Sequence, residues 1–399
     1  MSASPALIAA WARSAVVPHG GALGLLQAHE IAAPVVQSLL ARAGVKPQAV
    51  DALVVGNALG AGGNPARMVS LAAGLPERCA ALSVDTQCCS GLDAVRMGVA
   101  LIESGQASVV IAGGVEAWSR APIRMTRPRH AGEKAQAYER PAFAPNPTQD
   151  PDLLLSAARY AASHGFTRTA QDAYAVLSHQ RAVAYQAQVS QEIVAVNGVP
   201  HDVYPRPLTP ERAARMPIAA HTDRQNAGEP GTHAASPAQG QDCSISRLGV
   251  SAKADGAAFV LLLSASACDQ LGAQAHARWV SSASIGCAPD TPLLAAQHAA
   301  LHALERAHLS SGQNLHAMEL HDAFAVQGLS FAQALGVSAE RINLRGGGLA
   351  RGHPIGASGA VALVRLLANL AQDAPVSGQG LVAVAGAGGV GAAAVLARL

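Results

Sequence analysis

Residues 82–116, LSVDTQCCSGLDAVRMGVALIESGQASVVIAGGVE, hold the pattern that decides the fold. Residues 82–85 are strand-like, and residues 108–112 form an apolar run that ends at Gly113-Gly114. Between these two runs, apolar side chains recur at helical spacing, at Leu92, Val95, Val99 and Ile102. A strand, an amphipathic helix and a second buried strand in succession predict α/β layering. In such folds the loops at the carboxyl ends of the strands carry the chemistry.

The same order recurs near the end of the chain. Ala357-Ser358-Gly359 precedes a second helical pattern, and the apolar residues 380–385 follow and end in another glycine run. The apolar positions of this second helix are Val361, Val364, Leu367 and Leu370. We therefore predict an internal duplication, in which two similar α/β halves stack on each other.

Composition limits the classes of function. The chain has 399 residues, of which 50% are apolar and 14% are charged. This length supports a large buried core and usually more than one compact domain. Lysine and arginine number 28 against 26 aspartates and glutamates, so the net charge is +2. A net charge this close to zero argues against nucleic-acid coating or membrane-surface binding as the main role. We therefore expect neither nucleic acid nor a membrane as a partner.

Two sequence features bear on the cellular compartment. The six cysteines show no C-x-x-C pair, and residues 1–17 lack the layout of a signal peptide. We therefore expect free thiols in a reduced, cytoplasmic compartment. Residues 374–397 are uncharged, but they contain six glycines and a proline. We interpret them as a buried hairpin with a turn at 386–391, and not as a membrane span.

The chain is predicted to divide into an N-terminal half with Cys88, an inserted loop-rich domain and a C-terminal half, at residues 1–119, 120–247 and 248–399. Strands near 110–119 and 248–265 would border the insertion, and a helical stretch is expected at 152–188. A cluster of basic residues between 120 and 140 is interpreted as a solvated face. A phosphate-bearing ligand is the alternative.

Cys88 is the first candidate for chemistry. It follows the strand-like residues 82–85 and lies where the helix begins. Backbone N–H groups at a helix N-terminus favour negative charge, so we expect a stabilised thiolate with a lowered pKa. The alternative is that Cys88 only fills space in the core.

Two histidines are further candidates. His353 lies among the glycines of residues 346–356, where the backbone is expected to press closely against a neighbour. It is placed to polarise a carbonyl or to activate a thiol, although a glycine-rich connection with an incidental histidine is the alternative. His321 follows a short apolar run and is either a second imidazole donor or a structural residue. The 15 histidines show no pair with metal-ligand spacing, so no metal site is expected.

Together these motifs resemble the thiolase superfamily. Cys88-Cys89-Ser90-Gly91, His321-Asp322-Ala323-Phe324 and Gly352-His353-Pro354-Ile355-Gly356 match its signatures in order. Residues 112–116 (AGGVE) and 251–258 (SAKADGAA) resemble two further landmarks, and the resemblance covers essentially the whole chain. It implies a thiolase fold with two similar βαβαβαββ halves in five layers and an inserted loop domain. It also implies acyl coenzyme A (CoA) thioesters as substrates, no permanently bound cofactor, and a homodimer or homotetramer.

The resemblance also implies roles for individual residues. Cys88 would be the nucleophile that takes the acyl group, His353 would activate it, and His321 would be a further catalytic imidazole. Ser251 and Phe324 would line the path of the pantetheine arm. Three further positions, Gly352, Gly356 and Ala387, would supply oxyanion contacts or position the backbone.

The sequence departs from the family where a second cysteine normally acts as acid and base on the α-carbon. The family's C-x-G motif aligns with Ala385-Gly386-Ala387, and the cysteine of the His-Asp-Cys-Phe variant found in sterol-carrier-protein-type thiolases is Ala323 here. Asp85 also replaces the asparagine that is usual ahead of the nucleophile. Loss of an acid/base group typically costs on the order of 100- to 10,000-fold in rate. The expectation is weak thiolysis, unless a histidine or Asp322 takes over proton transfer.

Three interpretations of function follow. The first is a thiolase-like acyltransferase of the acetyl-CoA acetyltransferase or 3-ketoacyl-CoA thiolase type. The second is a decarboxylative condensing enzyme that uses Cys88, His321 and His353 as ketoacyl synthases do, because decarboxylation needs no acid/base cysteine. The third is a CoA-binding subunit that works with a small partner chain.

Overall fold

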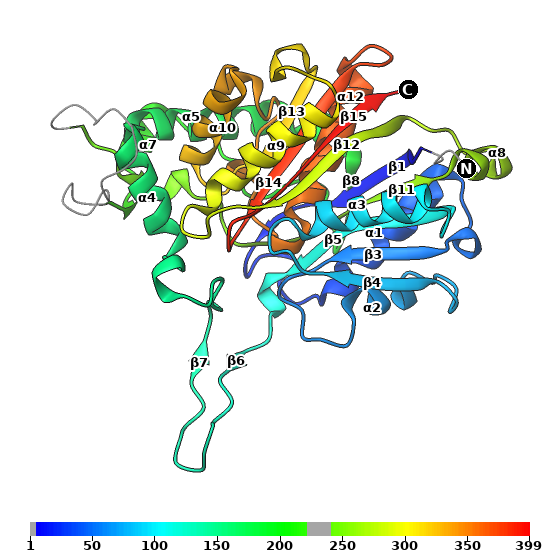
Figure 1. The fold of residues 1–399 in the computed structure, drawn as a ribbon, viewed down its shortest axis with the longest axis horizontal. Helices are drawn as coiled ribbons and strands as arrows, with labels where there is room; N and C mark the ends of the chain where they lie inside the picture. Colours follow the sequence, from blue (N-terminus) through cyan, green and yellow to red (C-terminus); the bar gives the residue numbers. More distant parts are fainter. Residues whose placement is uncertain (1–4, 222–240) are drawn as a thin grey trace.

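The computed structural model describes residues 5–221 and 241–399. Its main elements form two successive groups with the same order (Figure 1). The first group is β1 (Leu7–Ser14), α1 (Ala28–Ala43), β3 (Ala52–Gly56), α2 (Pro65–Ala72), β4 (Ala80–Val84), α3 (Ser90–Glu103), β5 (Val109–Ala117) and β11 (Ala254–Leu263). The second group is β12 (Ala277–Gly286), α9 (Ala295–Arg306), β13 (Ala317–His321), α10 (Ala325–Leu335), α12 (Ser358–Asp373), β14 (Gln379–Gly386) and β15 (Val390–Arg398).

The internal duplication predicted from the sequence is confirmed by this order. In the second group, the place of β4 is held by a single residue, Ile342, which forms a parallel bridge to Met318 of β13. The strands follow the order β13-β14-β15-β12-β1-β11-β5-β3-β4. At the join, β1 and β12 share only the pairs Leu7 with Arg278 and Ile8 with Ala277. The strands therefore form one hydrogen-bonded sheet in two parts that join at one corner, the first sheet (β1, β11, β5, β3 and β4) and the second sheet (β12, β15, β14 and β13).

Helices divide the molecule into five layers. The largest buried cluster joins α3 and α12 to the facing sides of both sheets. A second cluster joins α1 and α2 to the outer side of the first sheet, and a third joins α9 and α10 to the outer side of the second. The central helices touch through glycine: a Cβ on Gly359 would lie 2.8 Å from the Cβ of Leu92, and one on Gly91 2.9 Å from the Cβ of Ala360. This approach brings the Cys88 and His353 segments together.

The apolar C-terminal region is part of the core. Residues 374–397 contain the antiparallel pair β14 and β15, so the predicted hairpin is confirmed. Of the described residues, one helical segment, Ile355–Asp373, is long and apolar enough to cross a membrane, and 83% of its apolar window is buried in the fold. A helix that lies between two sheets is expected to be largely apolar, and two of its buried polar side chains, Arg365 and Asn369, bond to each other at 2.8 Å.

The apolar run that ends at Gly113-Gly114 is shorter than the strand it belongs to, because β5 continues to Ala117, in agreement with the strand expected near 110–119. These glycines are needed inside the strand for close packing. A Cβ on Gly113 would lie 2.0 Å from the carbonyl oxygen of Ala258, and one on Gly114 2.2 Å from that of Gly356. Glycine in a strand often marks such an approach of another backbone.

Between β5 and β11 the chain forms a separate covering region. The helical stretch expected at 152–188 is interrupted by Gly165, whose φ is +71°, and separates there into α4 (Leu153–His164) and α5 (Arg168–Ala184). A second break at Tyr185 separates α5 from α6 (Gln186–Val189). The expected loop-rich part at residues 222–240 lies outside the described residues. The boundaries of the insertion stay a prediction.

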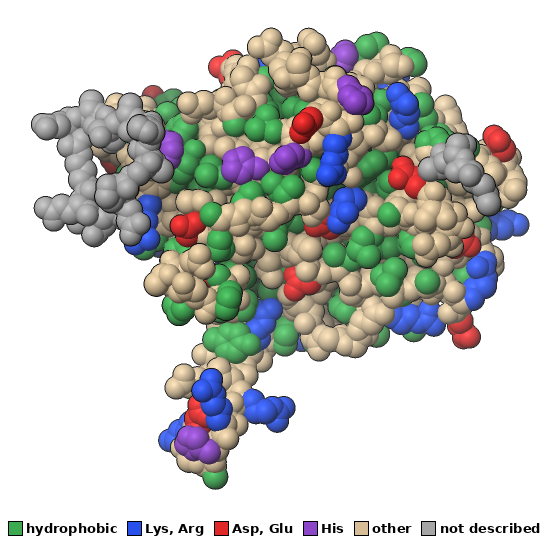
Figure 2. Space-filling view, in the orientation of Figure 1, with side chains coloured by type: hydrophobic (Ala, Val, Ile, Leu, Met, Phe, Trp, Pro, Cys, Tyr) green, Lys and Arg blue, Asp and Glu red, His purple; other side chains and the backbone are tan. Residues whose placement is uncertain are grey.

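A thin arm extends from this region, with β6 (Arg124–Met125) and β7 (Ala137–Tyr138) paired at its base (Figure 1). The residues from 124 to 140 are exposed or half-buried. On the face shown in Figure 2, Lys and Arg side chains lie on the arm, and they do not continue as a basic surface onto the body of the molecule. This placement favours the interpretation of the basic cluster as a solvated face.

Candidate active site

Cys88 lies in a tight turn between β4 and α3. Gln87 has a φ of 57°, a left-handed conformation that is rare for residues other than glycine. Its N–H donates to Asp85 Oδ1 at 2.9 Å, and the Ser90 hydroxyl donates to its carbonyl oxygen at 2.5 Å. The Ser90 hydroxyl also accepts the N–H of Thr86 at 2.9 Å. The turn therefore fixes the thiol just before the first residue of α3.

His353 faces this thiol from the second half of the chain. It follows α11 (Gly348–Arg351) and Gly352, whose φ of +114° favours glycine. The His353 N–H donates to the carbonyl oxygen of Ala252 at 2.7 Å, which ties the segment to the start of β11. Nε2 of His353 lies 3.1 Å from Sγ of Cys88. Residues 265 positions apart in the sequence thus form a hydrogen-bonded pair.

His321 lies on the other side of His353. It ends β13, and its Nε2 contacts Nδ1 of His353, with the two ring centroids 4.4 Å apart. Burial lowers the pKa of His353 to about 4 and lowers that of His321 well below its usual value. Both rings are therefore neutral near pH 7. A neutral His353 that donates from Nδ1 to His321 keeps Nε2 free to accept the Cys88 proton.

The expected lowering of the Cys88 pKa is contradicted. Burial raises the pKa of this thiol to about 12, and the backbone N–H groups of Ala387 and Cys88 offset only part of that rise. The helix N-terminus alone is therefore too weak to hold a thiolate in so enclosed a place. The arrangement is a neutral thiol beside a neutral imidazole, which suits transfer of the proton to Nε2 as the sulfur attacks.

The three positions expected to shape the oxyanion site differ in what they offer. The Ala387 N–H points to the Cys88 sulfur, so it is available to an oxygen that develops charge there. The N–H of Gly356 donates to Glu116 Oε2 at 2.9 Å, and that of Gly352 donates to the carbonyl oxygen of Gly348 at 2.7 Å. Gly352 and Gly356 therefore position the backbone.

Glu116 is a positioning residue that sequence analysis treated only as a landmark. It ends the glycine-rich part of β5 and is buried. Its Oε2 accepts the N–H groups of Ala58 at 3.0 Å and Gly356 at 2.9 Å, and its Oε1 accepts the Asn57 amide at 2.9 Å. Burial raises its pKa to about 7 against these donors. One carboxyl group thus joins a loop of the first half to the segment that carries His353.

Ser251 and Phe324 lie next to each other at the site. The N–H of Ser251 donates to the carbonyl oxygen of Ala323 at 2.9 Å, and Val250 forms an antiparallel bridge with Phe324. The Ser251 hydroxyl donates to the carbonyl oxygen of Gly348 at 2.7 Å. Ser251 and Phe324 are half-buried, so part of each surface is accessible beside the catalytic segments.

The two positions without the expected thiol are also part of this region. Ala385 lies near the end of β14 and is 9% exposed. Ala323 is half-buried, and its N–H donates to Gln327 Oε1 at 2.9 Å. A methyl group at either position transfers no proton.

Buried charges support the segments that carry the histidines. Arg351, two residues before His353, lies with its Nη2 3.7 Å from Oε2 of Glu319, which is two residues before His321. Glu319 Oε1 also accepts the Asn369 amide at 2.8 Å.

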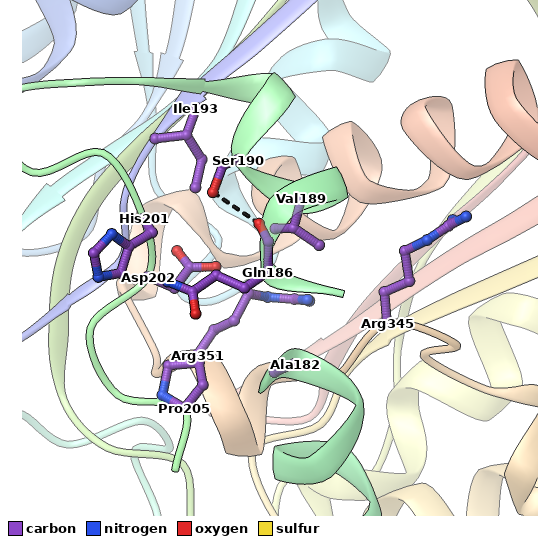
Figure 3. A pocket seen from close by; sticks show the side chains of 10 residues that line it. All are labelled: Ala182, Gln186, Val189, Ser190, Ile193, His201, Asp202, Pro205, Arg345 and Arg351. Atoms are coloured by element: carbon purple, nitrogen blue, oxygen red, sulfur yellow. Dashed lines mark hydrogen bonds between the residues drawn. The ribbon is translucent and has the colours of Figure 1, made fainter. Parts of the chain in front are cut away.

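Figure 3 shows Arg351 and Asp202 at a cavity of about 10 Å³. That volume is too small for an acyl group, so the cavity belongs to the supporting structure.

Metal ligands do not gather at the site. Within residues 5–221 and 241–399, no three His, Cys, Asp or Glu side chains are grouped so that they would hold a metal ion.

Comparisons with known proteins cover the whole chain. Residues 6–266 match the family model "Thiolase, N-terminal domain", and residues 273–398 match "Thiolase, C-terminal domain". An acetyl-CoA acetyltransferase of Cupriavidus necator is 34% identical over 98% of this chain and 99% of its own length. One from Pseudomonas aeruginosa is 35% identical, again over 98% of this chain and 99% of its own length.

Solved structures give the same result for the fold. A thiolase from Ascaris suum in complex with coenzyme A has a TM-score of 0.87 at 26% identity and covers 99% of this chain and 100% of its own. An acetyl-CoA acetyltransferase from Bacillus anthracis has the same TM-score and identity and covers 100% of both chains. The fold class expected from the sequence is thereby confirmed.

Proposed function

The chain belongs to the thiolase family and is a thiolase-type acyl-CoA acyltransferase, and from this premise we propose that Cys88 carries the acyl group as a thioester. The observation that supports the proposal is the 3.1 Å contact between Cys88 Sγ and His353 Nε2. The sulfur attacks the thioester carbonyl carbon of an acyl-CoA while its proton passes to Nε2. The carbon–sulfur bond to CoA then breaks, and the departing CoA sulfur takes the proton from His353.

The remaining groups act around this step. The N–H groups of Ala387 and Cys88 stabilise the charge that develops on the carbonyl oxygen. His321 holds His353 in the tautomer that accepts a proton at Nε2. Ser251 and Phe324 line the pantetheine path, in keeping with their accessible surfaces at the site. These steps need a thiol, imidazoles and backbone N–H groups, so we propose that no cofactor is permanently bound.

Reactions that require proton transfer at the α-carbon are proposed to be slow. Ala385 and Ala323 stand where a thiol would perform that transfer, and its loss typically costs on the order of 100- to 10,000-fold. Exchange of the acetyl group between acetyl-CoA and labelled CoA needs Cys88 and His353 but no acid/base thiol. The wild type is therefore expected to catalyse exchange readily and to cleave acetoacetyl-CoA with CoA slowly.

The test compares both reactions in the wild type, Cys88→Ala and Ala385→Cys. Exchange is expected to disappear in Cys88→Ala, and thiolysis is expected to increase by about 100-fold in Ala385→Cys. Ala383→Cys, on the same strand, is the matched control and is expected to leave thiolysis unchanged. Vigorous thiolysis by the wild type would contradict the proposal that proton transfer at the α-carbon is slow. Exchange that persists in Cys88→Ala would contradict the role of Cys88 as the nucleophile.

A second candidate is decarboxylative condensation. The contact between His321 and His353 beside Cys88 favours it, because two imidazoles suit a reaction in which loss of CO₂ creates the carbanion. Turnover with malonyl-CoA but not acetyl-CoA as the second substrate would support this candidate. If no CoA thioester acylated Cys88 although CoA still bound, that result would support the third candidate, a CoA-binding subunit that works with a partner.

We also propose a homodimer, located in the cytoplasm. The edge strand β4 and its neighbours expose Met68, Leu71, Leu82 and Met97, and exposed apolar surface at a sheet edge is typical of an interface between copies. Free thiols at Cys79, Cys88, Cys89, Cys268 and Cys287 are in keeping with a reducing compartment.

A further inference from the structure

The opening of the site contains an aromatic side chain with no role so far. Cys88, His353, Ser251 and Phe324 are each half-buried, so they keep some accessible surface among largely buried neighbours. Trp118 shares this property. Its ring centroid lies 6.3 Å from that of His353, and the two ring planes are inclined by 58°. The chain has only three tryptophans, and one of them stands beside the imidazole that faces the nucleophile.

The backbone of Trp118 is held firmly in place. Trp118 directly follows β5 and begins a short 3-10 turn, Trp118–Arg120. The next residue, Ser119, donates its N–H to Asp255 Oδ1 at 2.8 Å and its hydroxyl to Asp255 Oδ2 at 2.6 Å. Asp255 is fully buried on β11. The backbone from which the indole projects is therefore held in place.

A lysine ammonium group lies over the indole ring. Nζ of Lys253 lies 5.0 Å from the centroid of the Trp118 ring, within the range of a cation–π contact. The ammonium group is held in turn by Glu139 Oε1 at 2.6 Å. Lys253 also forms a parallel bridge with His353, so the residue that covers the indole is tied to the catalytic segment.

We propose that the Trp118 indole is a wall of the acyl pocket and restricts the acyl group on Cys88 to short chains. This inference rests on the proposed acyl-Cys88 intermediate. An acyl group on Sγ starts 3.1 Å from Nε2 of His353, and the indole contacts the same imidazole, with the two ring centroids 6.3 Å apart. An acetyl group, which has one carbon beyond the carbonyl, is expected to end before it reaches the indole. A longer chain that lies along His353 meets the ring and has to displace an anchored, cation-covered side chain, which is unfavourable in a well-packed site.

The test measures acylation of Cys88 with acetyl-, butyryl-, hexanoyl- and octanoyl-CoA in equimolar competition, followed by intact-protein mass spectrometry. The wild type is expected to carry mainly the acetyl group. In Trp118→Ala the ratio of octanoyl to acetyl adduct is expected to increase by about tenfold or more, in keeping with the discrimination that pockets achieve per methylene. Trp118→Phe and Lys253→Met are expected to shift the ratio in the same direction by less.

The control is Trp11→Ala, which removes another half-buried tryptophan that packs against His276 far from the nucleophile in sequence. It is expected to leave the ratio unchanged. Retained acetylation of Cys88 shows that a variant is folded. If Trp118→Ala does not fold, the adduct ratio is measured in Trp118→Phe and Lys253→Met instead. An unchanged ratio in the Trp118 and Lys253 variants, or a wild type that takes octanoyl as readily as acetyl, would overturn the inference while acyl-Cys88 stands. No adduct from any thioester would overturn both proposals.

Discussion

At the scale of single residues, enclosure governs the chemistry of Cys88 and His353. Burial raises the pKa of the thiol to about 12 and lowers that of the imidazole to about 4, so each group is held in its neutral form near pH 7. The nucleophile is then formed only as the proton moves to Nε2 during attack. This resting state protects the thiol from small electrophiles, because the thiolate is the reactive form.

Alkylation of Cys88 by iodoacetamide is therefore expected to depend strongly on pH. The thiolate fraction rises with pH up to the thiol pKa of about 12, so the rate is expected to increase continuously between about pH 6 and about pH 9. Peptide-level mass spectrometry measures the rate at Cys88, with Cys268 in the same sample as an internal reference. A rate that is already level at pH 6 would show a thiolate paired with an imidazolium and would contradict the neutral resting state.

Glu116 is expected to contribute to stability through the donors it accepts. In Glu116→Gln an amide N–H₂ group would face N–H groups of Ala58 or Gly356, and an unpaired buried donor costs about 1–3 kcal/mol. The free energy of unfolding is expected to fall by about 2 kcal/mol, as measured by urea denaturation. Glu103→Gln, at an exposed position of α3, is the control. If the free energy of unfolding fell no more in Glu116→Gln than in the control, Glu116 would not contribute to stability.

The sequence was sufficient to identify Cys88, His321 and His353 as candidates, and the structure brings all three together. The sequence was not sufficient to predict the protonation states of these three side chains. The sign of the Cys88 pKa shift depends on how much protein encloses the sulfur, and residues of both halves supply that enclosure. The bridging role of Glu116 likewise depends on contacts across the fold and has no local signal.

At the scale of elements, the contact between α3 and α12 sets the geometry of the site. Each helix begins next to a catalytic segment, and glycine at Gly91 and Gly359 lets the two helices approach. The helical patterns were readable from their apolar spacing. The need for glycine at these two positions was not readable from the sequence, because each glycine packs against a helix more than 250 residues away in the chain.

Gly359→Ala is expected to disturb both stability and chemistry. The new Cβ would lie 2.8 Å from the Cβ of Leu92, and overpacking of this kind costs about 1–3 kcal/mol. Urea denaturation is expected to show that loss. Acetylation of Cys88 is expected to slow, since the helices must move apart. Gly286→Ala, where a Cβ meets no atom within 4 Å, is the matched control, and equal effects of the two substitutions would contradict this account.

The exposed edge of β4 is expected to form the dimer interface. Leu71 and Leu82 are 49% and 40% exposed, and a lysine at each would place charge in the interface. Sedimentation velocity is expected to show a dimer for the wild type and a monomer for the double variant Leu71→Lys, Leu82→Lys. Leu25→Lys, at an 87% exposed leucine that belongs to neither β4 nor α2, is expected to remain dimeric. A wild type that sediments as a monomer would refute the interface.

At the scale of the whole molecule, the site exists only where the two halves meet. The first half supplies Cys88, and the second supplies His353 and His321. The duplication was visible in the sequence as a repeated order of helix and strand, and the family followed from motifs spread over the chain. The five layers and the corner contact between the sheets follow from packing, which periodicity in the sequence does not specify.

The assembled site is expected to form an acyl-Cys88 intermediate, and intact-protein mass spectrometry after incubation with acetyl-CoA detects it. We expect a mass gain of one acetyl group in the wild type and none in Cys88→Ala. An equal gain in both proteins, or no adduct from any acyl-CoA in the wild type, would contradict it.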